Sequence, residues 1–218
     1  MSITNSDRLA KISKDFPLWC NATENVRMRP LCIFYPETKE DVVEIIADAR
    51  KKGIAIHPIG AGHSFSEAAL GDYYVILPLK LTDCSVYNTA LKTGILKEKK
   101  HLVKVQSGIR IKSLNKKLWR MGFAVNNMGA FDWQTISGAI STGTHGTGIN
   151  RPAMQDQVRA IILVLASGET WQIEPKDGIT DPALFDQNIG IKLVQDDNNF
   201  YSAVLSMGAM GFIYELII

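Results

Sequence analysis

Two glycine-rich segments, about eighty residues apart, constrain this sequence more than any other feature. The first is IGAGHSF at residues 59–65, and the second is SGAISTGTHGTG at residues 137–148. Glycine tolerates positive φ and lets the backbone approach a ligand closely. The second segment adds hydroxyl side chains and no acidic residue, so it offers donors without a charge that would repel a phosphate. We predict an anion cradle there rather than a flexible linker, since Ala139, Ile140 and His145 interrupt the segment.

Two known motifs resemble the first segment, and neither fits it. A dinucleotide-binding fingerprint of the G-x-G-x-x-G type would need glycine where Phe65 stands, and no clear helix opens directly after it. A G-x-S-x-G hydrolase elbow fails as well, because Ser66 occupies the position of the last glycine. From these residues alone, a tight turn between a strand and a loop is at least as well supported as a phosphate site.

Histidine occurs in both segments, as His63 and His145. A lone histidine is more often structural than catalytic. No carboxylate or cysteine joins either one at ligand spacing, so no metal site is predicted. His57 and His101 are expected to have surface or packing roles. Five further large side chains are expected to fill the core: Trp119, Phe123, Trp171, Met207 and Met210.

Apolar periodicity predicts alternating helices and strands, which indicates an α/β or α+β layered fold. Helices are expected over residues 38–52, 111–122 and 200–207, the first with Thr38 as N-cap and Gly53 after its end. Gly208 is expected to end the last helix. Strands are expected over residues 54–59, 73–77, 102–106, 158–166, 170–173 and 212–218, with 158–173 as a hairpin. Residues 1–35 show no clear pattern overall, but Trp19 and the apolar positions over 26–34 indicate an extended segment that packs against other elements.

Composition argues against several kinds of partner. The net charge of +2 gives no strong reason to expect nucleic acid or an anionic membrane. The longest apolar stretch, 160–166, is far shorter than the ~20 residues of a transmembrane segment. Three cysteines without a CxxC pair, after an N-terminus without an apolar run, favour reduced thiols and a cytoplasmic location. The apolar run 212–218 is followed by no turn, so the chain is expected to be a truncated piece.

Taken together, the motifs resemble the FAD-binding domain of the vanillyl-alcohol-oxidase (PCMH-type) flavoprotein family. Within it, the chain is most similar to the sugar-1,4-lactone oxidases and alditol oxidases. The resemblance covers nearly the whole chain. It is carried by RP at 29–30, PETKEDV at 36–42, GAGHSF at 60–65, NMG at 127–129, TISG at 135–138, STGTHG at 141–146 and GAMG at 208–211.

The resemblance implies an α+β fold of two subdomains that hold an extended FAD between them. Residues 1–106 would form the first, around a small strand layer. Residues 107–218 would form the second, around a mixed or antiparallel sheet flanked by helices. This is not a Rossmann fold, in agreement with the failed fingerprint. The substrate domain and the catalytic residues are expected C-terminal to this chain, so no catalytic residue is named.

The resemblance also assigns cofactor contacts. His63 matches the histidine that bonds covalently to the 8α carbon of the flavin. Ala130 departs from relatives that carry serine there, which puts a side-chain hydrogen bond in doubt. The full set of matched cofactor positions is Ile59, Gly60, Ala61, Gly62, His63, Ser64, Gly129, Ala130, Thr135, Gly138, Thr142, Gly143, Thr144, His145, Gly211 and Ile213.

The activity implied is oxidation of a CH–OH group in a sugar lactone or polyol, with hydride transfer to flavin N5. Molecular oxygen is the expected acceptor, because Gly129 lies where relatives gate oxygen. The alternatives are a dehydrogenase with a cytochrome or quinone acceptor, a sterol oxidase, and a stand-alone FAD-binding domain without catalysis. A nicotinamide-dependent Rossmann enzyme is disfavoured by Phe65.

Overall fold

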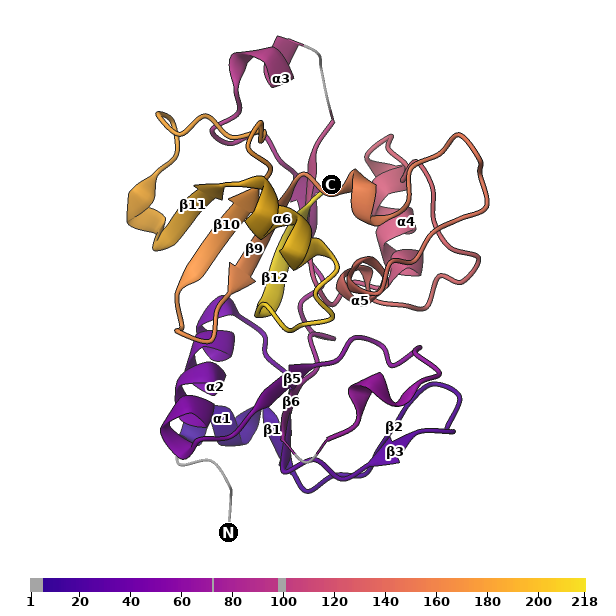
Figure 1. The fold of residues 1–218 in the computed structure, drawn as a ribbon, viewed down its shortest axis with the longest axis vertical. Coiled ribbons are helices and arrows are strands. Elements are labelled where there is room, and N and C mark those ends of the chain that lie inside the picture. The colour runs from indigo at the N-terminus through magenta and orange to yellow at the C-terminus, as the bar shows by residue number, and fades with distance from the viewer. Residues whose placement is uncertain (1–5, 72, 98–100) are drawn as a thin grey trace.

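The computed structural model describes residues 6–71, 73–97 and 101–218, and contains two sheets one above the other (Figure 1). The smaller sheet has the order β1-β4-β6-β5, and the larger has the order β11-β10-β9-β12-β8-β7. The smaller sheet comprises β1 (Ser13–Asp15), β4 (Cys32–Phe34), β5 (Ile56–Pro58) and β6 (Tyr74–Ile76). A separate ribbon of β2 (Trp19–Cys20) and β3 (Arg27–Met28) lies beside it. The α+β class is confirmed.

Helix α2 (Lys39–Lys52) supports the smaller sheet. Thr38 and Asp41 form a capping box at its start, and Gly53 ends it in the left-handed region at φ 66°. Its inward face buries Val42 and Ile45 completely, which contributes roughly 1.5–3 kcal/mol per side chain. The short α1 (Asp7–Lys11) packs against it. The predicted helix over 38–52 is confirmed.

The larger sheet is mainly antiparallel. Its strands are β7 (Cys84–Val86), β8 (Val103–Gln106), β9 (Ala160–Val164), β10 (Thr170–Glu174), β11 (Ile191–Gln195) and β12 (Phe212–Ile217). Among the described strands of this sheet, β10 and β11 alone pair in parallel. Helices α4 (Ile111–Arg120), α5 (Ile136–Ser141) and α6 (Asp197–Val204) pack on one face of the sheet. Residues around α3 (Thr93–Lys97) cover the opposite face. The hairpin expected over 158–173 is confirmed as β9 and β10.

Two expectations were wrong, and one helix was not predicted. The last helix begins at Asp197, capped by the Asp196 side chain, and ends at Val204 before Gly208. Residues 136–141 form α5, a helix that apolar periodicity did not predict. Trp119, Met207 and Met210 are respectively 81 %, 59 % and 39 % exposed instead of filling the core. Trp171 and Phe123 do pack against the main core.

The chain passes from the smaller sheet to the larger one between β6 and β7. The strands β7 and β8, which precede residue 107, therefore already belong to the larger sheet. The subdomain boundary at residues 106 and 107 stays a prediction. Val164 and Phe212 of the larger sheet pack into the same cluster as α2, so the two sheets share buried contacts. No helix within the described ranges is long and apolar enough to cross a membrane.

Candidate functional site

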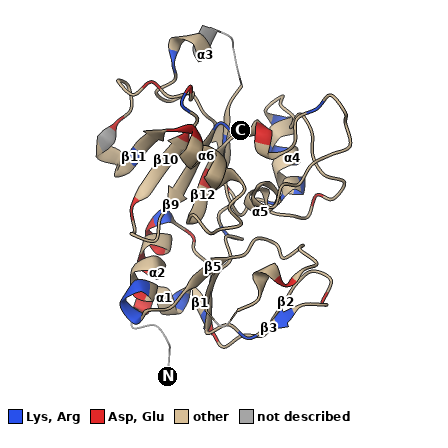
Figure 2. Cartoon of the chain, viewed as in Figure 1, with Lys and Arg blue, Asp and Glu red and all other residues tan. Residues whose placement is uncertain are grey.

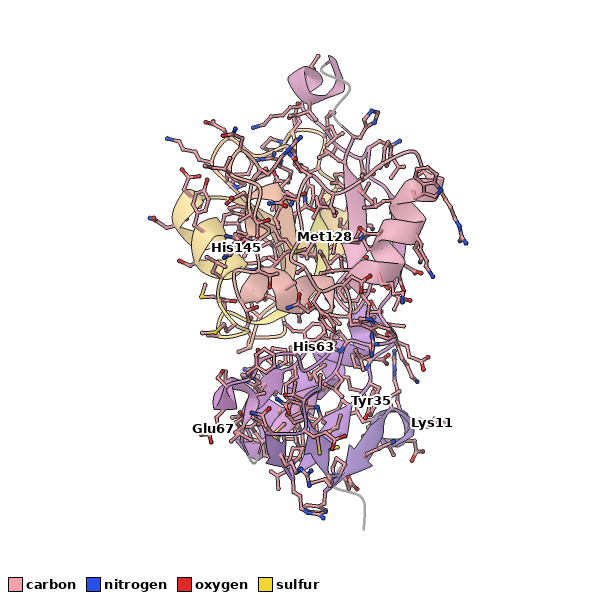
Figure 3. All side chains as sticks on the ribbon, turned by 90° about the vertical axis from the view of Figure 1, so that its right-hand side faces the viewer. Lys11, Tyr35, His63, Glu67, Met128 and His145 are labelled. Atoms are coloured by element: carbon pink, nitrogen blue, oxygen red, sulfur yellow. The ribbon has the colours of Figure 1, made fainter. Side chains whose placement is uncertain are left out.

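A cavity of about 570 Å³ lies where the two sheets meet. Its size is within the range of small-molecule sites. His63 lies at this level of the molecule, below His145 and Met128 (Figure 3). Four segments line the cavity: Ile56–Ser64, Gln134–Thr142 in part, Ser206–Ile213 in part, and a rim that includes Trp19, Ala68, Ala69 and Pro78. The two glycine-rich segments of the sequence are thus brought together.

The first glycine-rich segment presents its backbone to this cavity. In the part of the chain that the structure describes, the amides of residues 60–64 donate no hydrogen bond to protein. Gly62 adopts φ 71°, which glycine accepts without strain. Successive free amides in a turn form a concave site for an anion. The geometry therefore favours the phosphate-site interpretation of this turn over the bare turn.

The residues that hold this turn come from the N-terminal loop, which the sequence did not identify. The Asn21 amide donates to the carbonyl of Ser64 at 3.0 Å, and Asn25 donates to that of Phe65 at 3.0 Å. The amide of Ala22 donates to the carbonyl of Gly62 at 2.8 Å. Asn21 is buried, and its side-chain oxygen also accepts from a backbone amide. The carbonyl groups of the turn therefore accept hydrogen bonds from the N-terminal loop, while its amides remain available to a ligand.

The second segment meets the first at backbone distance. Thr135 caps α5 by accepting from the amide of Gly138 at 3.4 Å. A Cβ on Gly60 would lie 2.2 Å from Thr135 Oγ1 and 3.5 Å from Gly138 Cα. Glycine at residue 60 is thus required for the close approach, a packing role as well as a conformational one.

The rest of the second segment lies beside the cavity. His145 is exposed, and its Nδ1 lies 3.0 Å from the carbonyl of Gly146. Gly129 is buried against Thr144, whose Cγ2 would lie 2.7 Å from an added Cβ. The lining does not include the predicted cofactor positions Gly129, Ala130, Gly143, Thr144 and His145. Their contact with FAD stays a prediction.

The segment that leads into β12 forms the third wall. Gly211 has φ 141°, and a Cβ there would lie 2.6 Å from the carbonyl oxygen of Val164, so only glycine fits. Ile213 lines the cavity as predicted. Ser206 also lines it, and its hydroxyl is buried without a hydrogen-bond partner among the described residues. No sequence motif identified Ser206. A buried unpaired hydroxyl costs roughly 1–3 kcal/mol, which a bound polar group would relieve.

His63 is half-buried in the cavity lining, with its ring edge-on to Phe131 at a centroid distance of 4.7 Å. Burial lowers the pKa of His63, the charge of Arg110 lowers it further, and a hydrogen bond with the backbone of Trp133 opposes them. His63 is thus biased toward the neutral imidazole, the nucleophilic form. His57 also lines the cavity, against our expectation of a surface or packing role alone, and burial lowers its pKa.

The chemistry of the walls suits a large, phosphate-bearing, partly apolar ligand. Among the described residues that line the cavity, none is Asp, Glu, Lys or Arg. A pyrophosphate would therefore be held by the amides of residues 60–64 rather than by cations. Pro58, Ile59 and Phe212 offer apolar surface for a ring system. The residues present fit FAD. Within the described ranges, no three His, Cys, Asp or Glu side chains are placed to share a metal ion.

Comparison with known proteins agrees with this geometry. Residues 30–174 match the model of the FAD binding domain family. The chain is 30 % identical over 185 residues to a D-arabinono-1,4-lactone oxidase of Yarrowia lipolytica, covering 85 % of this chain and 31 % of that protein. It is 27 % identical over 200 residues to an L-gulono-1,4-lactone dehydrogenase of Mycobacterium tuberculosis, covering 92 % of this chain and 40 % of that protein. The chain thus spans well under half the length of these curated relatives.

Among solved structures, cholesterol oxidase from B. sterolicum superposes with a TM-score of 0.73 at 14 % identity. The match covers 99 % of this chain and 38 % of that one. Alkyldihydroxyacetonephosphate synthase superposes with a TM-score of 0.64 at 18 % identity, over 89 % of this chain and 32 % of that one. At such identities the likeness establishes the fold, and it confirms the predicted FAD-binding architecture.

Proposed function

The chain belongs to the FAD binding domain family, and on that premise we propose that it is the cofactor-binding part of a flavin-dependent oxidoreductase acting on a CH–OH group of a sugar lactone or polyol. The observation that carries the proposal is the cavity between the sheets, whose described lining has no charged side chain and includes the free amides of residues 60–64 and the ring of His63. The names of the similar proteins, a lactone oxidase and a lactone dehydrogenase, supply the substrate class.

The chain's own residues would divide the work of holding FAD. The free amides of Gly60–Ser64 would bind the pyrophosphate. Ile59, Gly211 and Ile213 would border the cofactor with apolar and backbone surface, and Thr135, Gly138 and Thr142 would contact it from the second segment. We extend the proposal to Gly129, Ala130, Gly143, Thr144 and His145, which lie just outside the lining.

His63 is proposed as the covalent anchor, joined to the 8α carbon of the flavin. Its lowered pKa keeps a lone pair on the imidazole near neutral pH. The hydrogen bond with the backbone of Trp133 and the edge contact with Phe131 would orient the ring. A covalent anchor prevents loss of the cofactor and withdraws electron density from it, which favours hydride acceptance.

When bound, FAD supplies the hydride acceptor, and this chain supplies its binding and orientation. The base that takes the substrate proton and the surface that binds the sugar are proposed to lie in a further domain of the whole protein. Molecular oxygen is the proposed electron acceptor, with Gly129 beside its path. A dehydrogenase is the second candidate, since one relative carries that name. Formation or absence of peroxide during turnover of the whole enzyme separates the oxidase from the dehydrogenase.

We also propose a cytoplasmic location for the protein.

The test is an absorbance spectrum of the purified protein, followed by acid denaturation and a fluorescence scan of the gel band. We expect yellow protein whose fluorescence stays with the band. His63→Ala should release the flavin on denaturation, whereas the control His57→Ala, another histidine of the same cavity, should retain it. Flavin released from the wild-type chain would disprove the covalent role alone. A chain that takes up no added FAD would disprove the proposed function.

A further inference from the structure

Helix α4 carries a row of cations on its outer face. Lys112, Lys116 and Arg120 are four residues apart, so they lie on one side of the helix. All three are exposed, while Ile111, Leu114 and Leu118 on the opposite side are buried in the core. Figure 2 shows the basic positions of α4 at the periphery of the molecule. The helix therefore does not use this face for folding.

Two tryptophans lie on the same surface. Trp119 is 81 % exposed, the most exposed large aromatic side chain in the described part of the chain. Trp133 is 44 % exposed, and the cations of Arg110 and Lys112 lie over its ring at 5.3 and 4.7 Å. Exposed aromatic side chains grouped on one face and bordered by polar groups are typical of an interaction surface.

The cations of this surface have no carboxylate partner among the described residues. Within the described ranges, Arg110, Lys112, Lys116 and Arg120 form no ion pair. The sequence of α4 contains no Asp or Glu. The nearby Asp132 contributes its carbonyl, which accepts from the amide of Lys112 at 2.8 Å. A net charge of only +2 for the chain thus conceals a local positive surface.

We propose that this α4 surface, formed by Arg110, Lys112, Lys116, Trp119, Arg120 and Trp133, docks the protein onto an anionic phospholipid surface. Clustered Lys and Arg are attracted to anionic headgroups without needing directional partners. Tryptophan prefers the headgroup region, where its ring is apolar and its N–H stays hydrated. The face is a convex helix side rather than a groove, and lysine is depleted from protein–protein interfaces. These features favour a lipid surface over a folded partner.

The proposal concerns attachment to the surface of a membrane. The apolar face of α4 stays in the core, so the helix itself does not insert. Trp133 belongs to the loop whose Phe131 contacts His63, a residue of the cavity lining, so the docking surface adjoins the cavity. The inference is independent of flavin binding, and its test uses no flavin signal.

The test is co-sedimentation of the chain with vesicles of phosphatidylcholine, with and without phosphatidylserine. We expect binding only to the anionic vesicles. The triple variant K112Q/K116Q/R120Q should bind on the order of 100-fold more weakly, since each surface cation contributes roughly a five-fold factor. The matched control is K11Q/K51Q/K176Q, which removes the same charge from exposed positions elsewhere. It should bind within a few-fold of the wild type, and raised salt should release both.

Trp119 gives an independent measurement. Its fluorescence should shift to the blue on addition of anionic vesicles, and Trp119→Ala should lose that shift while it keeps the melting temperature of the wild type. Equal weakening in both triple variants would show attraction by net charge alone and would overturn the proposal. So would binding confined to an oligonucleotide or an acidic peptide, or no binding to either kind of vesicle.

Discussion

The two glycine-rich segments have similar compositions and different physical roles. In residues 60–64 the amides donate no hydrogen bond within the described part of the chain, and all five residues line the cavity. In residues 138–144 the amides of Gly138, Ala139, Thr142, Gly143 and Thr144 are all bonded within α5 and its C-terminal turn. The first segment uses glycine to expose donors, and the second uses it to let a helix approach the turn. Composition alone does not distinguish these uses, because it does not show which acceptor, if any, each backbone amide binds.

The strongest test of this comparison is the contact between the segments. Gly60→Ala would place a Cβ 2.2 Å from Thr135 Oγ1, a buried side chain with little room to move. We expect a loss of about 3 kcal/mol in the free energy of unfolding, the upper end for overpacking, and loss of FAD binding. Urea unfolding and flavin titration measure the two effects.

A double variant checks the cause. Thr135→Ala removes the clashing oxygen but also the cap of α5, which costs about 1 kcal/mol alone. If the clash is the cause, Gly60→Ala/Thr135→Ala should be more stable than the sum of the single losses predicts. Strict additivity would show that residue 60 needs glycine for another reason.

The second test places a negative charge in each segment. Ala61→Asp puts a carboxylate among the free amides, where it would occupy the donors and repel a phosphate. We expect FAD affinity to fall by roughly 30-fold, about 2 kcal/mol. Thr147→Asp puts the same charge at an exposed position of the second segment, outside the lining, and should change affinity only a few-fold. Similar losses in both variants would contradict the distinction drawn between the segments.

Local patterns in the sequence were enough for much of the fold. Thr38, the apolar spacing behind it and Gly53 predicted α2 because capping and periodicity are local. The hairpin of β9 and β10 was predicted for the same reason. The role of the first glycine-rich turn needed both the family resemblance and the structure, since free amides are visible only once every hydrogen bond is placed.

What the sequence did not predict depends on distant contacts. Asn21 lies more than forty residues from the carbonyl it binds at Ser64, and no motif links the two. Ser206 was missed because an unpaired buried hydroxyl is a property of packing. Trp119 was assigned to the core on residue type, yet its helix turns Leu114 and Leu118 inward and leaves position 119 outside. Periodicity read along α4 would have corrected that assignment.

Asn21 provides the third test, since its side chain binds the backbone carbonyl of Ser64 in the first segment. Asn21→Ala leaves the carbonyl of Ser64 and the amide of Val26 without their partners. We expect a loss of about 1.5 kcal/mol in the free energy of unfolding, and slower covalent attachment of FAD because His63 is less well placed. Asn25→Ala, at an exposed position, should have a smaller effect on both. Equal effects of Asn21→Ala and Asn25→Ala would show that the burial of Asn21 does not determine how strongly it stabilises the first segment.

The smallest expected effect concerns the protonation of His63 in the first segment. Its pKa lies below the ordinary 6.5, partly through the charge of Arg110. The stability that this lowered pKa contributes is fully present above the unfolded value of 6.5 and is lost as the pH falls from there through the lowered pKa. The neutral, nucleophilic imidazole is lost as the pH falls through the lowered pKa itself. Arg110→Gln should raise the pKa, so that covalent attachment of FAD declines at a higher pH than in the wild type.

Arg110→Lys keeps the charge and should restore the wild-type profile, which separates electrostatics from the stacking of Arg110 on Trp133. The measurement is the rate of covalent attachment against pH, in protein prepared without flavin. At high pH the three proteins should agree, because His63 is neutral in all of them. A profile that is unchanged in Arg110→Gln would mean that solvent screens this charge, and that burial alone keeps the first segment's histidine neutral.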